Sequence, residues 1–528
     1  MTSLFARFES NAARHPEKAA LIYAQDGDWI TVTYAQLLDS SLRFADGLSA
    51  CSLTPGSTAA LMTPPSADFF ALAFALLKQG IVPVIVDPAI GLKKVGECLA
   101  EAKPEIFIGN GLTHTLRILF GWGKDSVKHN LTMASVQRST FKVQPQPRIS
   151  NSQSPVTSPA AIIYTSGSTG LPKGAVYTQG NFSAQLDMLA DTFKISPDEI
   201  DLPAFPLYAL IDSLLGVTSV IPDINFPVPG KTDPAKVIGA IQKFNVTNMF
   251  ASPVVLNILA DYGIPLSAKL PSLKRVITAG APATIQLQHE FRKLLADQTD
   301  LFGIYGATET LPIAKVESRE IFSMKEKTEN GAGICLGKPI EGVTVRIIRI
   351  TDEPLEEWRD SLTVESNVVG EITVQSAATT GSYIHRADAN RLSKIRFGDD
   401  IIHRMGDVGY FDEEGRLWYC GRKSHRVVTE DDVLFTEQIE NIFNAHSRVA
   451  RTALVGVRGK PVLWVELKKG VRENKDTIKA DLMAMAGRHP QASTIKDFLF
   501  MKKFPTDVRH NSKIIREELT SLAEKRLS

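Results

Sequence analysis

The chain has 528 residues, a length that favours two or more domains over one. Its 59 Lys and Arg residues balance 58 Asp and Glu residues, so the overall charge gives no reason to expect a nucleic-acid partner. The four cysteines, Cys51, Cys98, Cys335 and Cys420, lack the paired spacing of a zinc site or a disulfide framework, and they favour reduced thiols in the cytoplasm.

Residues 1–120 alternate helical patterns with short apolar runs. A helix is predicted over residues 66–78, and its apolar stretch is too short to span a bilayer. The N-terminal residues lack the layout of a signal peptide, so no transmembrane or leader segment is expected. Residues 81–87 predict a buried strand. Residues 125–158 are rich in Ser, Thr, Gln and Pro with little periodicity, and they predict a surface excursion.

The most informative stretch is the loop at residues 164–174, which reads Tyr-Thr-Ser-Gly-Ser-Thr-Gly-Leu-Pro-Lys-Gly. Its glycines allow sharp turns and close approach to a ligand, and its hydroxyls, amides and Lys173 suit a polyphosphate. The spacing differs from a Walker A loop, because Lys173 stands three residues after Gly170 and is followed by Gly174. A flexible linker is the alternative, but the apolar run at 160–164 predicts a buried strand that leads directly into the loop.

Between residues 160 and 315 strands and helices alternate again, and residues 246–251 and 275–280 are predicted to be parallel strands. A further strand at 300–304 precedes the motif Tyr305-Gly-Ala-Thr-Glu309. Thr308 can donate a hydrogen bond to a phosphate oxygen, and Glu309 can hold Mg²⁺. Taken alone, this motif is weak evidence for a nucleotide site, and a helix N-cap with a nearby glutamate is the better interpretation.

Residues 334–422 contain strand-like runs between turns and predict a mostly β region. Asp407 lies between glycines shortly before a predicted hairpin turn at 412–415, where its carboxylate can accept both hydroxyls of a ribose. Arg422 can reach the same ribose or a phosphate. The plainer alternatives are a turn aspartate and a surface ion pair. About a hundred residues follow, enough for a small separate domain, and Lys513 near their end would ordinarily be a solvated side chain.

Together these segments resemble the superfamily of adenylate-forming enzymes, which contains acyl-CoA synthetases, nonribosomal adenylation domains and luciferases. The resemblance extends from about residue 10 to about residue 525, because the five motifs occur in the family's order and spacing. It implies an α/β fold in which residues 1–422 form a large domain of two α/β layers, with a β-rich subdomain at 334–422. Residues 423–528 would form a small mobile α+β domain that carries Lys513.

The resemblance also implies a role for each motif residue in an ATP- and Mg²⁺-dependent ligase. Glu309 would coordinate Mg²⁺, Thr308 would contact the α-phosphate, and Lys513 would bring the substrate carboxylate and the α-phosphate together. The residues implied to bind ATP are Thr165, Ser166, Gly167, Ser168, Thr169, Gly170 and Lys173 at the β- and γ-phosphates, Gly280, Ala281, Pro282, Tyr305 and Gly306 around the adenine, Thr308 at the α-phosphate, and Asp407 and Arg422 at the ribose.

Three positions depart from the pattern of the CoA ligases in this superfamily. Ala209 stands where a histidine often follows Pro-Leu-Phe, His425 replaces the hinge aspartate, and Asp431 replaces a loop glycine. In CoA ligases that glycine lets the loop pass beside the pantetheine arm, whereas Asp431 adds a side chain and a negative charge. CoA is therefore expected to be a poor nucleophile here, unless the loop has shifted its register and still serves CoA.

An acyl adenylate without an external acceptor can be attacked by its own 3-hydroxyl, which gives a four-membered β-lactone and AMP. Residues 201–212, 220–224, 305–314 and 509–514 are similar to the β-lactone synthetases of bacterial long-chain olefin biosynthesis. That resemblance implies a long-chain 2-alkyl-3-hydroxyalkanoic acid as substrate and a possible complex with other enzymes of olefin biosynthesis.

Two other functions stay open. A long-chain fatty acid–CoA ligase shares every adenylation residue, and a non-catalytic acyl- or adenylate-binding protein is disfavoured by the intact Glu309 and Lys513. Three residues are candidates for the base that takes the 3-hydroxyl proton: His425, His510 and Asp431. The candidates for the acyl pocket are Phe205, Leu207, Tyr208, Phe250, Ala251 and Ser252.

Overall fold

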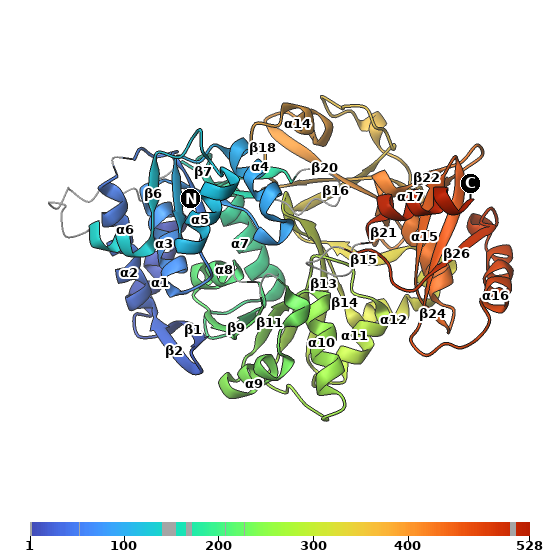
Figure 1. Ribbon diagram of the computed structural model, residues 1–528, viewed down its shortest axis with the longest axis horizontal. Coiled ribbons are helices and arrows are strands. Elements are labelled where there is room, and N and C mark those ends of the chain that lie inside the picture. The colour runs from blue at the N-terminus through green and yellow to red at the C-terminus, as the bar shows by residue number, and fades with distance from the viewer. Residues whose placement is uncertain are drawn as a thin grey trace.

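The computed structural model describes residues 3–51, 53–139, 155–164, 172–205, 207–225, 228–506 and 514–527. In this part of the chain two large β-sheets carry helices on their faces, and a smaller group of elements follows toward the C-terminus, at the right of Figure 1. The central strands of both large sheets are parallel and connected by helices, which confirms the predicted α/β fold. No helix in the described ranges is long and apolar enough to cross a lipid bilayer.

The first sheet has seven strands in the described residues, in the order β18-β8-β7-β4-β3-β5-β6. Its strands are β3 (Thr58–Met62), β4 (Val82–Ile85), β5 (Ile106–Gly109), β6 (His129–Leu131), β7 (Pro159–Tyr164), β8 (Gly174–Thr178) and β18 (Ser382–Tyr383). The helices of this region are α2 (Tyr34–Ser49), α3 (Ala67–Gln79), α4 (Leu92–Ala102), α5 (Gly111–Phe120), α6 (Met133–Ser139) and α7 (Gln179–Phe193). The strands predicted at 81–87 and 160–164 are therefore confirmed as β4 and β7.

Helix α3 shows why its boundaries were predictable. Ser66 caps the N-terminus by accepting a hydrogen bond from the Phe69 amide, and Gly80 ends the helix with φ +67°, a conformation that favours glycine.

The surface excursion predicted over 125–158 was wrong in part, because this region contains β6 and α6. Strand β6 has three residues and exists through its pairing with β5, a tertiary contact that leaves no periodic pattern in the sequence.

The second sheet has fourteen strands in the described residues, and its order is β16-β17-β20-β21-β15-β14-β13-β12-β11-β9-β10-β1-β2, with β19 paired to β20. Its strands are β1 (Ala19–Gln25), β2 (Asp28–Thr33), β9 (Ile200–Pro203), β10 (Thr218–Ile221), β11 (Asn248–Ala251), β12 (Arg275–Thr278), β13 (Asp300–Ala307), β14 (Thr310–Glu317), β15 (Ile334–Pro339), β16 (Val343–Ile348), β17 (Gly370–Ser376), β19 (Lys394–Phe397), β20 (Asp400–Phe411) and β21 (Leu417–Arg422). Its helices are α1 (Leu4–Arg14), α8 (Tyr208–Leu215), α9 (Pro234–Phe244), α10 (Pro253–Gly263), α11 (Ile285–Arg292), α12 (Ser318–Ser323), α13 (Lys325–Lys327) and α14 (Ala387–Ser393).

The predicted parallel strands at 246–251 and 275–280 are confirmed as β11 and β12, which pair with each other in parallel. Residues 334–422 form mostly strands, as predicted, and all of these strands except β18 continue the same sheet from β14 onward. This continuity has a consequence for the site, because it places β13 and the β20–β21 hairpin in one sheet although residues 308–399 separate them in sequence.

The largest apolar core lies between the two sheets. It contains buried residues of α1, α2, α3, α7 and α8 together with residues from strands of both sheets, and the Phe8 and Phe74 rings stack at its centre with 3.9 Å between their centroids. Burial of this apolar surface holds the two sheets together across the helices.

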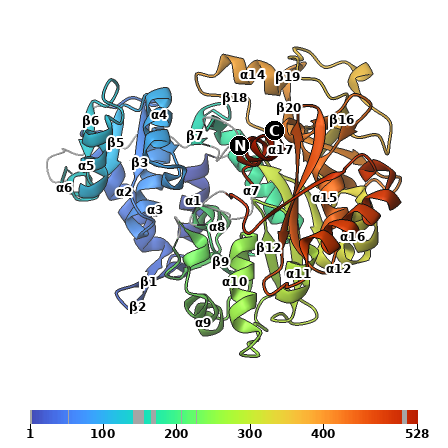
Figure 2. The same cartoon turned by 45° about the vertical axis from the view of Figure 1, so that its right-hand side comes forward.

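After Arg422 the chain forms a separate group with its own apolar core. Its elements are β22 (Val427–Val428), β23 (Val433–Leu434), α15 (Thr436–Asn444), β24 (Val449–Val457), β25 (Lys460–Leu467), α16 (Lys475–Arg488), β26 (Asp497–Met501) and α17 (Arg516–Leu527). Figures 1 and 2 both show this orange-to-red group at the opposite side from the blue strands β1 and β2. The domain division between residues 422 and 423, and the mobility of the second part, stay predictions.

Candidate active site

The β13–β14 hairpin occupies the centre of the candidate site. Strand β13 ends at Ala307 and β14 begins at Thr310, so Thr308 and Glu309 form a two-residue turn. Tyr305 lies two residues before the end of β13. The hairpin therefore presents Tyr305 on one side and the Thr308–Glu309 turn at its tip, where residues from other strands meet both.

The predicted ribose-binding residues come together on the Tyr305 side. Asp407, on β20, is 5% exposed, and its Oδ2 accepts a hydrogen bond of 2.7 Å from the Tyr305 hydroxyl. The Arg422 guanidinium at the end of β21 lies 3.1 Å from Asp407 Oδ1 and also donates to the Met405 carbonyl at 3.3 Å. Burial and the nearby Asp407 raise the pKa of Tyr305, so its hydroxyl remains a donor at neutral pH. The Asp407 carboxylate raises the pKa of Arg422.

The segment predicted to line the adenine follows β12, the parallel neighbour of β13. Gly280 has φ +91° directly after the strand, and Gly280 and Pro282 are exposed while Ala281 is half-buried. Because β12 and β13 are parallel neighbours, this segment lies at the carboxyl ends of the strands, where ligands of open α/β sheets bind.

Glu309 is held at the hairpin tip by two residues that sequence reasoning missed. The Tyr383 hydroxyl, from β18, donates to Glu309 Oε1 at 2.5 Å. The Thr380 amide and hydroxyl both donate to the Glu309 carbonyl, at 2.8 and 3.1 Å. The Tyr177 hydroxyl of β8 donates to the Thr308 carbonyl. These contacts tie the two large sheets together at the site, and no local sequence pattern marks them.

Lys173 lies on the same side as Glu309, and its Nζ is 5.1 Å from the centroid of the Tyr383 ring. Through Tyr383, the structure thus brings Lys173 close to the Thr308–Glu309 turn, from a distant part of the sequence. The remaining predicted phosphate-loop residues and the C-terminal residues of interest lie outside the described residues: Thr165, Ser166, Gly167, Ser168, Thr169, Gly170, His510 and Lys513.

The donor set at Glu309 fits a magnesium ion. Tyr383 occupies Oε1, and the described residues form no hydrogen bond or ion pair with Oε2, so one carboxylate oxygen is available to a hard cation. Within the described ranges no cluster of three or more His, Cys, Asp or Glu side chains gathers around a metal position. One carboxylate fits an ion whose other ligands are phosphate oxygens and water, which is the usual arrangement for Mg²⁺ in nucleotide sites.

Three aromatic residues predicted for the acyl pocket also meet. The Tyr208 ring stacks on Phe250 with 3.6 Å between centroids, and the Phe205 ring lies 6.3 Å from Tyr208 in an edge-on arrangement. Ala251 is buried behind Phe250, Leu207 is half-buried, and Ser252 precedes α10 without capping it through its side chain. The pocket assignment itself stays a prediction.

A buried carboxyl pair lies one helical turn after Tyr208. The Asp212 side chain on α8 hydrogen bonds to that of Asp201 on β9, and the Ser219 hydroxyl donates to Asp212 Oδ2 at 2.6 Å. Both aspartates are less than 9% exposed. Burial raises the pKa of Asp201 to about 7, and burial together with the Asp201 charge raises the pKa of Asp212 well above its usual range.

This pair predicts a pH-dependent stability. Because both pKa values lie above the usual 3.8, the folded state binds more protons than the unfolded state, and stability falls as the pH rises toward and past about 7. The unfolding free energy of the parent should fall between about pH 5 and about pH 8.5. Asp212→Asn removes one of the two carboxyls, so the fall in the variant should be smaller, by on the order of 1–3 kcal/mol. Urea unfolding at both pH values measures this. The exposed Asp223→Asn is the control, and parallel pH curves for Asp212→Asn and the parent would contradict the prediction.

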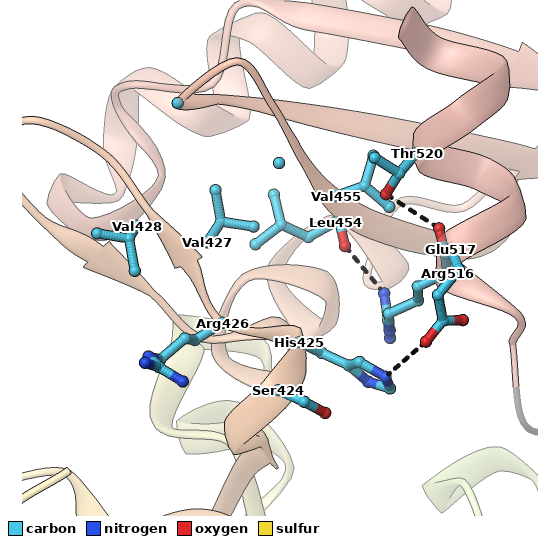
Figure 3. Close-up of a pocket in the computed structure, with 12 residues that line it drawn as sticks. Ser424, His425, Arg426, Val427, Val428, Leu454, Val455, Arg516, Glu517 and Thr520 are labelled. Atoms are coloured by element: carbon cyan, nitrogen blue, oxygen red, sulfur yellow. Dashed lines mark hydrogen bonds and ion pairs between the residues drawn. The ribbon is translucent and has the colours of Figure 1, made fainter. Parts of the chain in front are cut away.

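The segment after Arg422 contributes to a hollow of about 340 Å³ between β22, β24 and α17 (Figure 3). His425 faces Glu517 across it, with 3.9 Å between Nε2 and Oε1. Burial and the charges of Arg516 and Arg422 lower the pKa of His425 to about 4, so its imidazole is neutral at pH 7 and a weak base. Asp431 is exposed on the loop between β22 and β23.

Solved structures share this fold. ATP-bound MatB from Rhodopseudomonas palustris superposes with a TM-score of 0.81 at 21% identity, over 100% of both chains. The O-succinylbenzoate CoA synthetase MenE from Bacillus subtilis, in complex with ATP and magnesium ion, gives a TM-score of 0.76 at 22% identity, over 98% of this chain and 99% of the other. At these identities the likeness concerns the fold alone.

Sequence comparison reaches further. Residues 8–384 match the family model described as AMP-binding enzyme. The olefin β-lactone synthetase of Xanthomonas campestris pv. campestris is 42% identical over 510 residues, which cover 93% of this chain and 90% of the relative. That of Stenotrophomonas maltophilia is 41% identical over 517 residues, covering 94% and 92%. These matches confirm both resemblances inferred from the motifs, and the chain belongs to the AMP-binding enzyme family and, within it, to the olefin β-lactone synthetases.

Proposed function

We propose that this protein activates a long-chain 2-alkyl-3-hydroxyalkanoic acid with ATP as an acyl adenylate, and then closes the adenylate to a β-lactone. The products are the lactone, AMP and pyrophosphate. The observation that carries the proposal is the β13–β14 hairpin, which joins a ribose-binding corner at Asp407 to a metal- and phosphate-binding end at Glu309. Membership of the olefin β-lactone synthetases supports the second half of the reaction.

In the first step a carboxylate oxygen of the substrate attacks the α-phosphorus of ATP, and the bond to the bridging oxygen of pyrophosphate breaks. Negative charge accumulates on the phosphates, and fixed positive groups around them lower the barrier. Lys173 and Lys513 would supply part of that charge. A Mg²⁺ ion held by Glu309 would neutralise charge on the leaving pyrophosphate. Asp407 would orient the nucleotide by accepting hydrogen bonds from the ribose hydroxyls.

In the second step the 3-hydroxyl oxygen attacks the acyl carbon, the bond from that carbon to the AMP oxygen breaks, and the hydroxyl proton passes to a base. Holding the hydroxyl beside the activated carbonyl converts the attack into an oriented intramolecular reaction. The low pKa of His425 disfavours it as that base, since a neutral imidazole with a pKa of about 4 accepts a proton poorly at pH 7. Asp431 and His510 remain the other candidates.

The exposed Asp431 supports closure of the ring over transfer to CoA. It places a carboxylate on the loop after the hinge, where a CoA ligase of this superfamily would have glycine, and CoA itself is an anion. Association with other enzymes of olefin biosynthesis is part of the proposal and rests on the family alone.

The decisive experiment supplies the purified protein with ATP, Mg²⁺ and a 2-alkyl-3-hydroxy acid, with and without CoA. We expect β-lactone in both reactions, together with stoichiometric AMP. Product that forms only with CoA, as a thioester, would instead establish a long-chain acyl-CoA ligase. Absence of acid-dependent exchange of pyrophosphate into ATP would indicate a non-catalytic binding protein.

Asp407→Asn tests the ribose corner. The substitution replaces a carboxylate that would accept both ribose hydroxyls with a neutral amide. Loss of hydrogen bonds to a charged group weakens binding by about 1.5–3 kcal/mol, so the KM for ATP should rise roughly 10–100-fold. The parent should also discriminate against 2′,3′-dideoxy-ATP, and the variant should lose that discrimination. Pyrophosphate exchange measures both. The exposed Asp400→Asn on the same strand is the matched control. An Asp407 variant that still discriminates would contradict the assignment.

A further inference from the structure

Lys394 is a buried lysine that neither the motifs nor the proposed chemistry uses. It begins β19, directly after α14, and the residue is 7% exposed. Its Nζ donates to the Thr380 carbonyl at 2.5 Å and lies 3.4 Å from the Thr380 hydroxyl. No carboxylate oxygen of the described residues lies within 4.0 Å of Lys394 Nζ. Burial disfavours the ammonium form of a lysine, and an anion bound nearby would stabilise that form.

The contacts of Lys394 place it at the metal- and phosphate-binding end of the site. Thr380, its hydrogen-bond acceptor, also donates through its amide and hydroxyl to the Glu309 carbonyl. Lys394 Nζ lies 5.4 Å from the centroid of the Tyr383 ring, and Lys173 Nζ lies 5.1 Å from the same centroid. The hydroxyl of that ring donates to Glu309. Lys394 therefore touches the two residues that hold Glu309, and it shares an aromatic neighbour with the phosphate-loop lysine.

Two charges act on Lys394 among the described residues: the Glu309 carboxylate favours its charged form, and the Lys173 ammonium disfavours it. Burial and Lys394 lower the pKa of His403, whose Nδ1 lies 3.1 Å from the Ser393 carbonyl, so this imidazole adds no charge. Burial and Lys173 lower the pKa of Lys394 to about 7, while Glu309 opposes that shift. A polyanion bound here would act in the same direction as Glu309 and favour the charged form of Lys394.

We infer that Lys394 is a second lysine of the polyphosphate end, beside Lys173, and that its charge stabilises the β- and γ-phosphates of ATP and the pyrophosphate that leaves. This inference rests on the proposed function only in placing ATP at this site. AMP, which has neither a β- nor a γ-phosphate, would gain nothing from Lys394. The distinction separates an electrostatic role from a structural one, in which Lys394 would merely hold the Thr380 loop in place.

Three substitutions in the full-length protein test the inference. Lys394→Gln retains a donor for the Thr380 carbonyl without the charge, Lys394→Met removes both, and Lys394→Arg retains the charge. Since a unit charge several ångströms from a polyphosphate in a partly buried site is worth a few kcal/mol, the Kd of Mg²⁺–pyrophosphate should rise roughly 10–100-fold in the Gln and Met variants. Calorimetric titration measures this, and the Kd of AMP should remain within about twofold. The arginine variant should lie between the parent and the glutamine variant.

The exposed Lys338→Gln on β15 controls for a general loss of positive charge, and melting temperatures control for folding. The inference would be overturned if the Lys394→Gln variant bound pyrophosphate as tightly as the parent. It would also be overturned if the Gln and Met variants lost AMP binding and pyrophosphate binding equally. Failure of the proposed function gives a different signature, in which the parent binds pyrophosphate and exchanges it into ATP but forms no lactone.

Discussion

Replacing Lys513 with alanine is expected to lower acyl-adenylate formation by about 10²–10³-fold while leaving the Kd of ATP nearly unchanged. The attacking carboxylate and the α-phosphate are both anions, and a lysine that bridges them acts mainly when charge builds up as pyrophosphate departs. Its loss therefore falls on the rate of adenylation rather than on nucleotide binding. Acid-dependent pyrophosphate exchange measures the rate, and equilibrium titration with ATP measures the binding.

The residues that follow Lys513 are anchored to the C-terminal sheet. Ile514 forms a β-bridge with Thr506, and the Arg516 guanidinium donates to both carboxylate oxygens of Glu440 at 2.5 and 3.0 Å. Arg516 also donates to the Leu454 carbonyl of β24 at 3.1 Å. The chain is thus fixed to the C-terminal sheet within three residues of Lys513. The exposed Lys503→Ala is the matched control, and unchanged exchange in Lys513→Ala would show that another residue bridges the two anions.

The parts of the fold that were predictable are those with strong local signals. Strands β4 and β7 are apolar runs, and β11 and β12 have apolar central residues, because strands buried on both faces of a sheet carry mainly apolar side chains. The C-cap glycine and N-cap serine of α3 are equally local. Strand β6, by contrast, depends on its pairing with β5, and the joining of β15–β21 to β14 depends on contacts between distant segments.

The candidate site divides in the same way. Tyr305, Asp407 and Arg422 each lie in a motif, so the sequence predicts them, but only the structure shows that the Tyr305 hydroxyl and the Arg422 guanidinium both contact the Asp407 carboxylate. Tyr383 and Lys394 lie outside every motif that the sequence analysis identified. A buried lysine looks like an exposed one in a sequence, because burial is a property of the packed neighbours.

The second large effect is expected at Glu309. Glu309→Gln keeps the shape of the side chain and removes the negative charge that would hold Mg²⁺ against the phosphates. A metal ion stabilises the developing charge of phosphoryl transfer by several kcal/mol, so adenylation should fall by about 10²–10³-fold at ordinary Mg²⁺ concentrations. The loss should be partly recovered by raising the Mg²⁺ concentration, because the variant binds the ion more weakly and does not lack the remaining machinery.

A second variant shows whether the effect passes through the metal-binding carboxylate. Tyr383→Phe removes the hydrogen bond to Glu309 Oε1 and keeps the ring, so adenylation should fall by only about 3–10-fold, because the Glu309 carboxylate that would hold the ion is still present. In the double variant the two effects should not add, since Tyr383 has no carboxylate left to orient. The exposed Glu326→Gln is the control for charge removal. Additive losses, or a Glu309→Gln variant whose activity does not respond to Mg²⁺, would place the metal elsewhere, because the hydrogen bond from Tyr383 would then serve the fold rather than the ion.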